Sequence, residues 1–558
     1  MGPGTLQLEG AQTYTGPTNV LAGVLAVDGS IQSDTVTVSS GATLSGFGDI
    51  YADVTNQGTV WPGNAVAGDT HYGTLTIHGN YIGQGGVLEL NTYLGGDGSP
   101  SDVLAIDGGA VTGTTGVTVH NTATSSGETS GNGILVVSAI GGATTTADAF
   151  NLLGEARSGA LDYRLFRGSV DGAQPDSWYL RNDFIVPPEP PVPPVPPEPP
   201  QPPEPNLPPD PPPEPLPPGV YPIIGPEVAT YGVVQPIARE LGLLTLGTKD
   251  QRIGDSALMA SSTAATDPGP SAWGRVFAAN IDNTYRAFAA PQAQGNLSGF
   301  QTGADIWQGE LIPGHSDRFG GYIAYSNADI NVRGLVTNAE ATNYAMQHTG
   351  SLTLHATSAG AYWTHYGPNG WYLDGVMQAS TYNGNASTQN ARLDTKGVGF
   401  MGSLEFGYPF ALPQLGASFT LEPQAQAIWQ NVRFSDNNDG LGDVALGSTH
   451  GVTGRVGLRG KWQLSTQNGQ LWEPYVAANF WRDWGGRSAT VFGDTAGNAS
   501  TAPLVPQASR AELAGGVTGK LLARLSVYGS LGYEHDVGDA TNAQREGFNA
   551  DVGVRYTW

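Results

Sequence analysis

The sequence predicts an all-β protein with three parts: an N-terminal solenoid of short strands, a stiff proline-rich linker, and a C-terminal transmembrane β-barrel with a helix in its lumen. Three observations lead to this prediction. Short runs of alternating apolar residues fill residues 1–186, 21 prolines fall within residues 187–218, and a longer aromatic-rich alternation fills residues 262–558. Between linker and barrel, residues 219–261 hold the one convincing helical pattern.

Composition narrows the possible functions. The 558 residues carry 49 acidic and 24 basic side chains, a net charge of −25, which argues against a nucleic-acid partner because phosphate recognition needs clustered Lys and Arg. The sequence has no Cys, which excludes a disulfide scaffold and cysteine catalysis. No apolar run reaches the roughly 18 residues of a transmembrane helix, whereas a barrel strand needs only about ten alternating residues.

The first ten residues do not have the basic start and apolar stretch of a signal peptide. The chain is therefore expected to be either cytosolic or cut from a longer precursor. The membrane-barrel pattern of the second half favours the precursor.

Residues 1–186 show the pattern of a strand stack. Six runs, separated by Gly, Asn and Asp turns, each place two apolar residues on one strand face: Val36/Val38, Leu75/Ile77, Leu88/Leu90, Leu104/Ile106, Val117/Val119 and Leu135/Val137. Such short, evenly spaced strands are typical of a solenoid, in which each coil buries its apolar face against the next. A β-sandwich is the alternative. Large residues near the end would close the stack: Trp61, Phe150, Tyr163, Phe166, Trp178 and Tyr179.

Residues 187–218 are expected to form a polyproline II spacer, because dense proline fixes φ and removes amide donors. At about 3.1 Å per residue, the segment could span on the order of 100 Å and hold the stack away from the barrel. A docking site for a proline-reading domain is the alternative.

The helix within residues 219–261 is amphipathic. Its apolar face has the i, i+4, i+7 spacing and consists of Ile237, Leu241 and Leu244. Pro236 is acceptable only in a first turn, so we expect a short helix before Gln235 and a longer one from Pro236 to about Thr248. The polar face comprises Arg239, Glu240, Lys249, Asp250 and Arg252. Such a helix could cover a domain surface or thread a polar lumen; the barrel pattern that follows favours the lumen.

The last eleven residues alternate without a break. One face carries Phe548, Ala550, Val552, Val554, Tyr556 and Trp558, and the other carries Asn549, Asp551, Gly553, Arg555 and Thr557. A lipid-facing apolar row and a lumen-facing polar row require this period. At roughly 25 residues per strand and connection, residues 262–558 predict twelve strands, an even number as such barrels require.

Several segments of the first part have a similar pattern of glycine and alternating apolar residues. They include Gly41-Ala-Thr-Leu-Ser-Gly-Phe-Gly-Asp-Ile and Gly73-Thr-Leu-Thr-Ile-His-Gly-Asn-Tyr. Over residues 40–183 they resemble the passenger of pertactin-like autotransporters. The resemblance implies a right-handed parallel β-helix at the membrane-proximal end of a passenger, where an autochaperone region folds first outside the cell and templates the rest.

The second part resembles the autotransporter β-domain in Ala272-Trp-Gly-Arg-Val-Phe, Glu473-Pro-Tyr-Val and the terminal Tyr556-Thr-Trp. The resemblance implies type V secretion: a monomeric twelve-stranded outer-membrane barrel, plugged by the helix, that displays its passenger on the cell surface. It also implies periplasmic chaperones and the barrel-assembly machinery as partners, which read a terminal signal formed by Phe548, Val552, Val554, Tyr556 and Trp558.

Candidate chemistry is weak. Gly254-Asp-Ser-Ala-Leu resembles a lipolytic nucleophile block, but no His follows an Asp at the spacing that would supply a base. Gly95-Gly-Asp-Gly-Ser-Pro resembles one calcium-binding nonapeptide, but Pro100 stands where that motif needs Asp, so Asp97 and Asp102 are expected to be turn residues. We therefore expect no enzymatic activity, no cofactor and no metal site.

Glu422 and Glu473 are candidate lumen acids. They either hold Arg239 or Arg252 or are solvated by lumen water.

Some autotransporters cleave their own linker through an Asn, but residues 207–279 contain no Asn, so no autocleavage is expected.

The resemblance implies that the passenger is an adhesin or virulence factor, with a host-surface receptor as its partner. The alternatives are a passive porin or surface structural protein, and the C-terminal part of an enzyme-bearing autotransporter.

Overall fold

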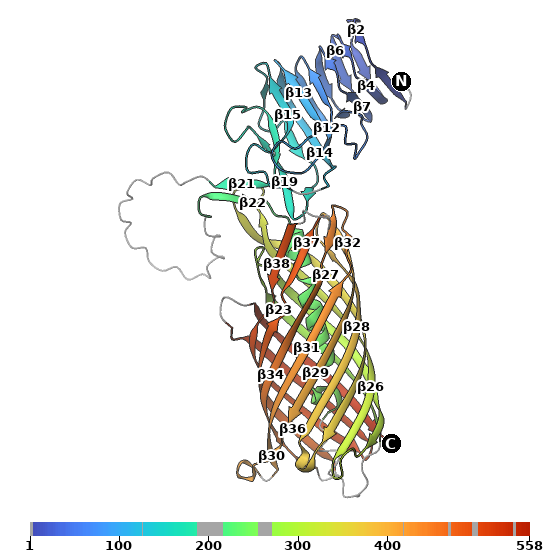
Figure 1. Ribbon diagram of the computed structural model, residues 1–558, viewed down its shortest axis with the longest axis vertical. Helices are drawn as coiled ribbons and strands as arrows, with labels where there is room; N and C mark the ends of the chain where they lie inside the picture. The colour runs from blue at the N-terminus through green and yellow to red at the C-terminus, as the bar shows by residue number, and fades with distance from the viewer. Residues whose placement is uncertain are drawn as a thin grey trace, which may run out of the picture.

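The computed structural model describes residues 4–124, 127–186, 216–254, 270–416, 418–466, 470–493, 500–538 and 543–558. The molecule is elongated, with a stack of strands standing on the open end of a tall barrel (Figure 1). The chain starts at the far tip of the stack and ends at the opposite end of the barrel.

The stack is a parallel β-helix, as the sequence predicted. Strands of one coil pair in parallel with those of the next: β1 with β4, β4 with β7, and β7 with β10 on one face, and β2, β5, β8, β11, β13 and β15 in order on another. The strands are β1 (Thr5–Leu8), β2 (Ala11–Gln12), β3 (Thr18–Val20), β4 (Gly23–Val27), β5 (Ser30–Ile31), β6 (Thr35–Val38), β7 (Ala42–Gly46), β8 (Asp49–Ile50), β9 (Asp53–Asn56), β10 (Thr59–Pro62), β11 (Thr74–Ile77), β12 (Tyr81–Thr92), β13 (Val103–Asp107), β14 (Ala110–Asn121), β15 (Ile134–Ile140), β16 (Thr144–Thr145) and β17 (Phe150–Leu152).

The core of the stack is a column of aliphatic side chains that repeats from coil to coil. The alternation places Val36, Val38, Leu75, Ile77, Leu88, Leu90, Leu104, Ile106 and Val117 fully inside. Val119 and Leu135 depart from the prediction and are only half-buried. At Leu135 the strand is irregular up to Val137, so Ile134 and Val136 take the inward positions. A short polar column accompanies the aliphatic one: Asn56 donates to the Tyr81 hydroxyl at 2.9 Å, which contacts Thr115 at 3.2 Å.

Antiparallel strands close the stack at the barrel end. β20 (Trp178–Arg181) pairs antiparallel with β15, β19 (Leu161–Arg167) with β20, and β18 (Ala156–Ser158) with β19. Trp178 lies edge-on against Phe150 at 5.4 Å and donates its indole N–H to Thr145 at 3.1 Å. The change of direction ends the parallel ladder, so no further coil can add on this side.

The two ends of the linker lie side by side, which we had not expected. β21 (Asp183–Val186) and β22 (Gly219–Pro222) form an antiparallel pair in which Val186 lies opposite Gly219. The stack also contacts the barrel directly, through an ion pair between Arg157 and Asp439 at 2.6 Å. The prediction that the linker separates stack from barrel is therefore wrong, because pairing on both sides of it brings its ends together. Residues 187–215, with the polyproline prediction itself, lie outside the described residues.

Three helices run down the barrel lumen (Figure 1): α1 (Pro226–Gly232), α2 (Val234–Leu246) and α3 (Lys249–Ile253). The first break falls at Val233, slightly earlier than expected, and Pro236 is the third residue of α2. The amide of Ile237, directly after the proline, makes a bond of 3.1 Å to the Val233 carbonyl, so the proline removes no helical hydrogen bond. Gly247 and Gly254, both at positive φ, end α2 and α3. In the part of the chain that the structure describes, no helix has the length and apolarity to cross a bilayer.

Twelve antiparallel strands close the barrel, as predicted, because β23 pairs with β41 and β29 pairs with β31. They are β23 (Ser271–Thr284), β25 (Gln292–Gly309), β26 (Ser316–Thr337), β27 (Tyr344–Tyr366), β28 (Tyr372–Ser387), β29 (Arg392–Gly407), β31 (Phe419–Phe434), β34 (Ser448–Trp462), β36 (Leu471–Gly485), β39 (Ser509–Leu522), β40 (Leu525–Asp536) and β41 (Gln544–Thr557).

Shorter elements decorate both ends. A second sheet of five short strands lies at the end that faces the stack: β24 (Arg286–Ala287), β32 (Asn437–Asn438), β33 (Asp443–Ala445), β37 (Ser488–Phe492) and β38 (Ser500–Val505). The remaining elements are η1 (Pro368–Gly370), β30 (Phe410–Ala411), η2 (Pro413–Leu415) and β35 (Leu464–Ser465).

Candidate functional site: the barrel lumen and its helices

The alternation of the barrel strands separates a lipid-facing surface from a polar lumen. On β41, Val552 is 61% exposed and Asp551 is 5% exposed, although they are neighbours in sequence. Phe548, Val554, Tyr556 and Trp558 share the outward face with Val552, and Arg555 lies inside with Asp551. Successive side chains of a strand point to opposite faces, so the same period creates an apolar outside and a charged inside.

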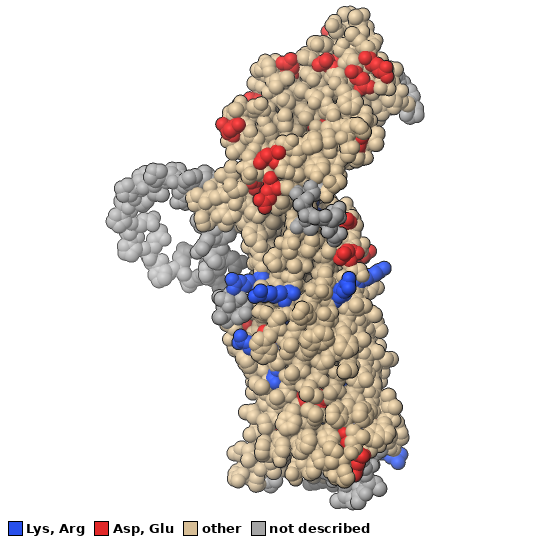
Figure 2. Space-filling view, viewed as in Figure 1, with Lys and Arg blue, Asp and Glu red and all other residues tan. Residues whose placement is uncertain are grey.

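Charge is unevenly distributed over the outer surface. On the face shown in Figure 2, Asp and Glu are scattered over the stack, whereas Lys and Arg gather in a band around the upper barrel. The exposed basic side chains of the barrel strands include Arg333, Lys396, Arg433 and Arg482. Charged side chains on the outer face are costly in hydrocarbon, so this band lies where the lipid-facing surface ends.

The upper half of the helical segment has an apolar face. Ile237 and Leu241 are fully buried in a cluster that includes Leu297, Leu352 and Leu354 of the barrel wall. Leu244, the third residue of the predicted stripe, is half-buried against this cluster. The cluster explains how a helix can be held in a largely polar lumen.

The C-terminal end of α2 is held through its carbonyl groups. Arg275 of β23 donates to the carbonyls of Thr245 at 2.6 Å and Leu244 at 3.2 Å, and Gln426 donates to that of Gly247 at 3.4 Å. The last carbonyls of a helix have no partner within the helix and carry partial negative charge. A barrel-wall guanidinium therefore stabilises this end twice, by hydrogen bonding and by charge.

Below it, α3 is fixed at its start and along its side. Thr248 and Gln251 form a reciprocal capping box. Arg252 makes two 2.8 Å bonds to Asp374, one to each carboxylate oxygen, and its own carbonyl accepts from the Tyr528 hydroxyl at 2.6 Å. A buried charge held by its opposite is stable, but either charge alone would be costly.

A second group of charges joins α3 to β29 and β34 of the barrel wall. Asp250 binds Lys249 and Arg459, each at 2.8 Å. The Lys249 backbone amide donates to Glu405 at 2.9 Å, and Glu405 also binds Arg455 at 3.1 Å. These contacts alternate in sign, so the charges of this group compensate one another.

Glu422 and Glu473 face the lumen and are both buried, but they do not hold the helices in the way considered above. They flank Lys461, whose Nζ lies 3.0 Å from Glu422 and 3.9 Å from Glu473. Arg252 binds Asp374 instead, and Arg239 lies against the backbone near Gly486, where an added Cβ would come within 1.6 Å of its Nη1. The strand register, which the sequence does not reveal, places a lysine between the two glutamates.

Little space remains beside the helices. A cavity of about 100 Å³ lies between α2 and the wall, lined by apolar residues such as Leu244 and Phe277 and by charged residues that include Glu240, Arg510 and Arg545. This space admits a few water molecules and no second polypeptide chain. Among the described residues, α1–α3 thus occupy the lumen between the barrel walls.

Residues 272–532 match the family model of the autotransporter β-domain. The chain belongs to the autotransporter family. Residues 52–165 match the type 1 autochaperone domain, and residues 1–27 match the passenger-associated transport repeat. The barrel of this autotransporter therefore lies in the bacterial outer membrane. Its passenger, which is the β-helical stack described above, is exposed at the cell surface.

Named relatives belong to the same family. The adhesin BmaC autotransporter of Brucella suis is 30% identical over 480 residues, which cover 82% of this chain and 12% of that protein. The probable autotransporter YfaL of Escherichia coli is 30% identical over 528 residues, 93% of this chain and 37% of that protein. This autotransporter chain thus spans a minor part of the length of both relatives. The transport unit of autotransporter AIDA-I from Escherichia coli aligns with 60% of this chain and 99% of its own, at 17% identity and a TM-score of 0.45.

The weak motifs have structural explanations where the structure describes them. Asp97 accepts from the amides of Gly131 and Gly133, and Asp102 from those of Gly73 and Asn91, so both carboxylates fasten the backbone of neighbouring coils. The segment Asp255–Leu258 of the lipolytic resemblance lies outside the described residues. Sequence reasoning overlooked one cluster, formed by Glu155, Asp162 and Glu227 at the base of the passenger of this autotransporter.

Proposed function

We propose that this autotransporter carries its passenger outward through its own barrel, and that α1–α3 are the segment left in the lumen when the passage is complete. The path of the chain is the observation that supports this proposal. The passenger stands at one end of the barrel, whereas β23 starts at the other, where Ser271 lies opposite Thr557 near the C-terminus. Between them, α1–α3 lie in the lumen.

Folding of the passenger supplies the direction of movement. Each coil that forms outside buries aliphatic side chains such as Leu75, Leu88 and Leu104. Full burial of one such side chain contributes about 1.5–3 kcal/mol relative to exposure. A folded coil is too wide to return through the lumen, so each addition makes the outward step effectively irreversible. The autochaperone region at the base of the passenger is the natural nucleus, because its antiparallel cap is a fixed end on which coils can stack.

Insertion of the barrel into the outer membrane is proposed to depend on periplasmic chaperones and on the barrel-assembly machinery. The outward face of β41 would be the signal: Phe548, Val552, Val554, Tyr556 and Trp558. This strand closes the barrel by pairing with β23, the first strand, so recognition of β41 would keep the closing edge occupied until the barrel is complete.

The passenger is proposed to act as a non-enzymatic adhesin with a host-surface receptor. A relative that covers most of this chain is named an adhesin, and a parallel β-helix presents long, regular faces suited to contact with another surface. Binding of cultured host cells by bacteria that display this chain would test the proposal. The comparison strain would display the same chain with Leu104→Asp, which places a charge in the passenger core. Equal adhesion by both strains would contradict the proposal.

Protease treatment of intact cells tests secretion itself. The chain is expressed behind an added secretion signal, and the cells are then exposed to protease. We expect the passenger to be digested and a heat-modifiable fragment that begins near residue 219 to remain. A passenger protected on intact cells, or a chain found free in the periplasm, would contradict the secretion proposal. A large stable conductance in planar bilayers would instead favour the passive-porin alternative.

A further inference from the structure

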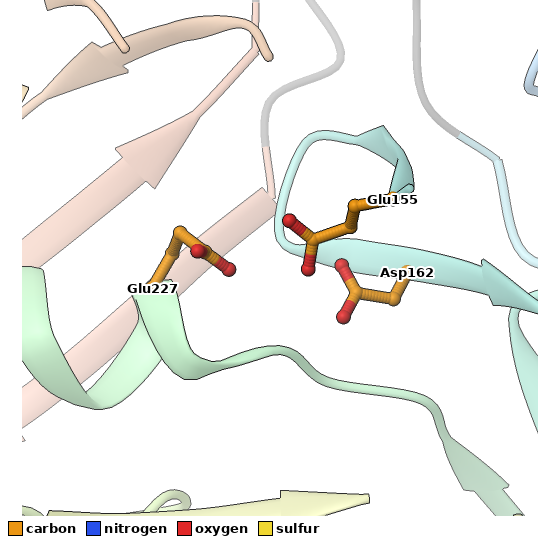
Figure 3. Close-up of side chains that lie close together, drawn as sticks. All are labelled: Glu155, Asp162 and Glu227. Carbon is orange, nitrogen blue, oxygen red and sulfur yellow. The ribbon is translucent and has the colours of Figure 1, made fainter. Parts of the chain in front are cut away.

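Three acidic side chains from two parts of the molecule meet where the passenger stands on the barrel. Glu155 precedes β18, Asp162 lies in β19, and Glu227 is the second residue of α1 at the barrel mouth. Figure 3 shows the three carboxyl groups turned toward one another. One oxygen from each lies within 4.8 Å of those of the other two.

Among the residues that the structure describes, the charges around this cluster do not balance. Arg157 is the basic side chain beside the cluster. Its Nη2 binds a fourth acid, Asp439, at 2.6 Å, whereas its Nη1 makes a longer contact of 3.9 Å with Glu227. The Tyr231 hydroxyl also donates to Asp439. One guanidinium thus faces four carboxyl groups. Buried carboxylates without a compensating positive charge are costly, so this site requires a cation or bound protons.

Several carboxyl oxygens in the cluster have no hydrogen-bond donor among the described residues. They are Oε2 of Glu155, Oδ1 of Asp162 and Oε2 of Glu227. Asp162 is 4% exposed and Glu227 is 1% exposed, so bulk water does not replace the donors. Thr388 donates to Oε1 of Glu227 at 2.5 Å and leaves the other oxygen bare. Buried oxygens that point into a site without donors are the arrangement that a metal ion satisfies.

A glycine keeps space open beside the same three carboxyl groups. A Cβ added to Gly225 would lie 2.4 Å from Oδ2 of Asp162, 2.7 Å from Oε2 of Glu227 and 2.9 Å from Oε1 of Glu155. The φ of Gly225 is −92°, which any residue adopts, so backbone geometry does not demand glycine here. The position is small because oxygens from three segments converge on it.

We infer that Glu155, Asp162 and Glu227 bind one Ca²⁺ ion that fastens the base of the passenger to the mouth of the barrel. Hard oxygen ligands suit Ca²⁺, and its bonds of about 2.4 Å allow oxygens that lie within 4.8 Å of one another to share one ion. Mg²⁺ demands a tighter octahedron near 2.1 Å and gives up its water reluctantly, and Zn²⁺ favours nitrogen and sulfur.

Given the outward passage proposed above, the site is complete only after secretion. Two ligands come from the folded end of the passenger, and the third comes from the helix at the barrel mouth, so neither part alone holds all three. Ca²⁺ binding therefore stabilises the docked passenger over the undocked one, by an amount that grows with the Ca²⁺ concentration outside the cell. Bound protons are the competing explanation, since burial, with the nearby Glu227, raises the pKa of Glu155 to about 7.

Calorimetric titration of the purified full chain in detergent tests this inference and does not depend on the secretion route. The chain is stripped with a chelator and titrated with CaCl₂ at about pH 8, and the urea midpoint of the passenger is measured with and without CaCl₂. We expect one Ca²⁺ per chain and a higher urea midpoint when it is bound. No binding by the wild-type chain, or an equal response to MgCl₂, would overturn the inference.

Two variants locate the binding. The double variant Glu155→Gln/Asp162→Asn keeps the shapes and removes the charge, and Gly225→Ala fills the space between the oxygens. Each should weaken Ca²⁺ binding at least tenfold, whereas Asp148→Asn, on an exposed acid of the passenger, should bind as the wild type does. Heat-modifiable migration of the barrel and a cooperative urea transition of the passenger show which variants are folded. If the double variant does not fold, Gly225→Ala decides. Wild-type affinity in a folded double variant, or in Gly225→Ala, would refute the site.

Discussion

Shortening one core side chain of the passenger should destabilise it measurably. Leu104 lies in β13 opposite Leu75 of the coil before and Val137 of the coil after, and it is 0% exposed. Leu104→Ala removes three carbon atoms and leaves a cavity, because strands held on both sides cannot collapse into it. Such a change costs about 2–5 kcal/mol. With a urea dependence of about 3 kcal/mol per molar, the unfolding midpoint should fall by roughly 1 M.

The assay is digestion of the passenger on intact cells in rising urea. Leu21→Ala is the matched control, because the same atoms are removed from a side chain that is 62% exposed, where substitutions change stability by about 0.5 kcal/mol or less. We expect Leu104→Ala alone to lower the urea concentration at which the passenger is digested. Equal midpoints for the two variants would refute the coil-stacking account of the core.

Three further predictions concern the lumen, the barrel end and the passenger base. Arg252→Ala leaves Asp374 buried without its basic partner, which should lower the stability of the lumen helices by about 3–5 kcal/mol. We therefore expect more frequent ion-conducting openings in planar bilayers than for Arg252→Lys, and identical current traces would contradict a plug held by this pair. Deletion of Trp558 should reduce the heat-modifiable barrel in outer-membrane fractions, and an unchanged yield would remove it from the assembly signal. The Thr145 amide and Arg167 lower the pKa of Asp176, so its contribution to passenger stability is present above about pH 4 and is lost as the pH falls below that value. The difference in urea midpoint between pH 7 and pH 3 should therefore shrink in Asp176→Asn, and an unchanged difference would show that other acids carry it.

Periodic features of the fold could be predicted from the sequence because one face of each strand meets a single environment. The alternation from Phe548 to Trp558 predicts the lipid and lumen faces of β41, and the observed exposure follows it. The same reasoning was less accurate at Leu135, where the strand is irregular at the point at which parallel pairing gives way to the antiparallel cap. The alternation of apolar and polar residues in the sequence does not indicate where a strand becomes irregular.

The partners within the lumen could not be predicted, because they depend on the stagger between strands. Glu422 and Glu473 were expected to face the lumen, but only the register of β31, β34 and β36 brings Lys461 between them. Arg252 finds Asp374 for the same reason. The acidic cluster at the passenger base was harder to predict, since Asp162 and Glu227 are far apart in the sequence and meet in a structure where β21 pairs with β22.

The repeated parallel pairing of the passenger has an evolutionary consequence. A coil such as β4–β6 meets its neighbours through the same contacts above and below, with Val24 opposite Thr5 on one side and Thr43 on the other. An in-frame duplication or loss of one coil would therefore leave the interfaces between the other coils unchanged. The antiparallel cap at the barrel end of the passenger would also remain unchanged. Genes of this architecture can alter the reach of the displayed protein by recombination between repeats while the export apparatus remains untouched.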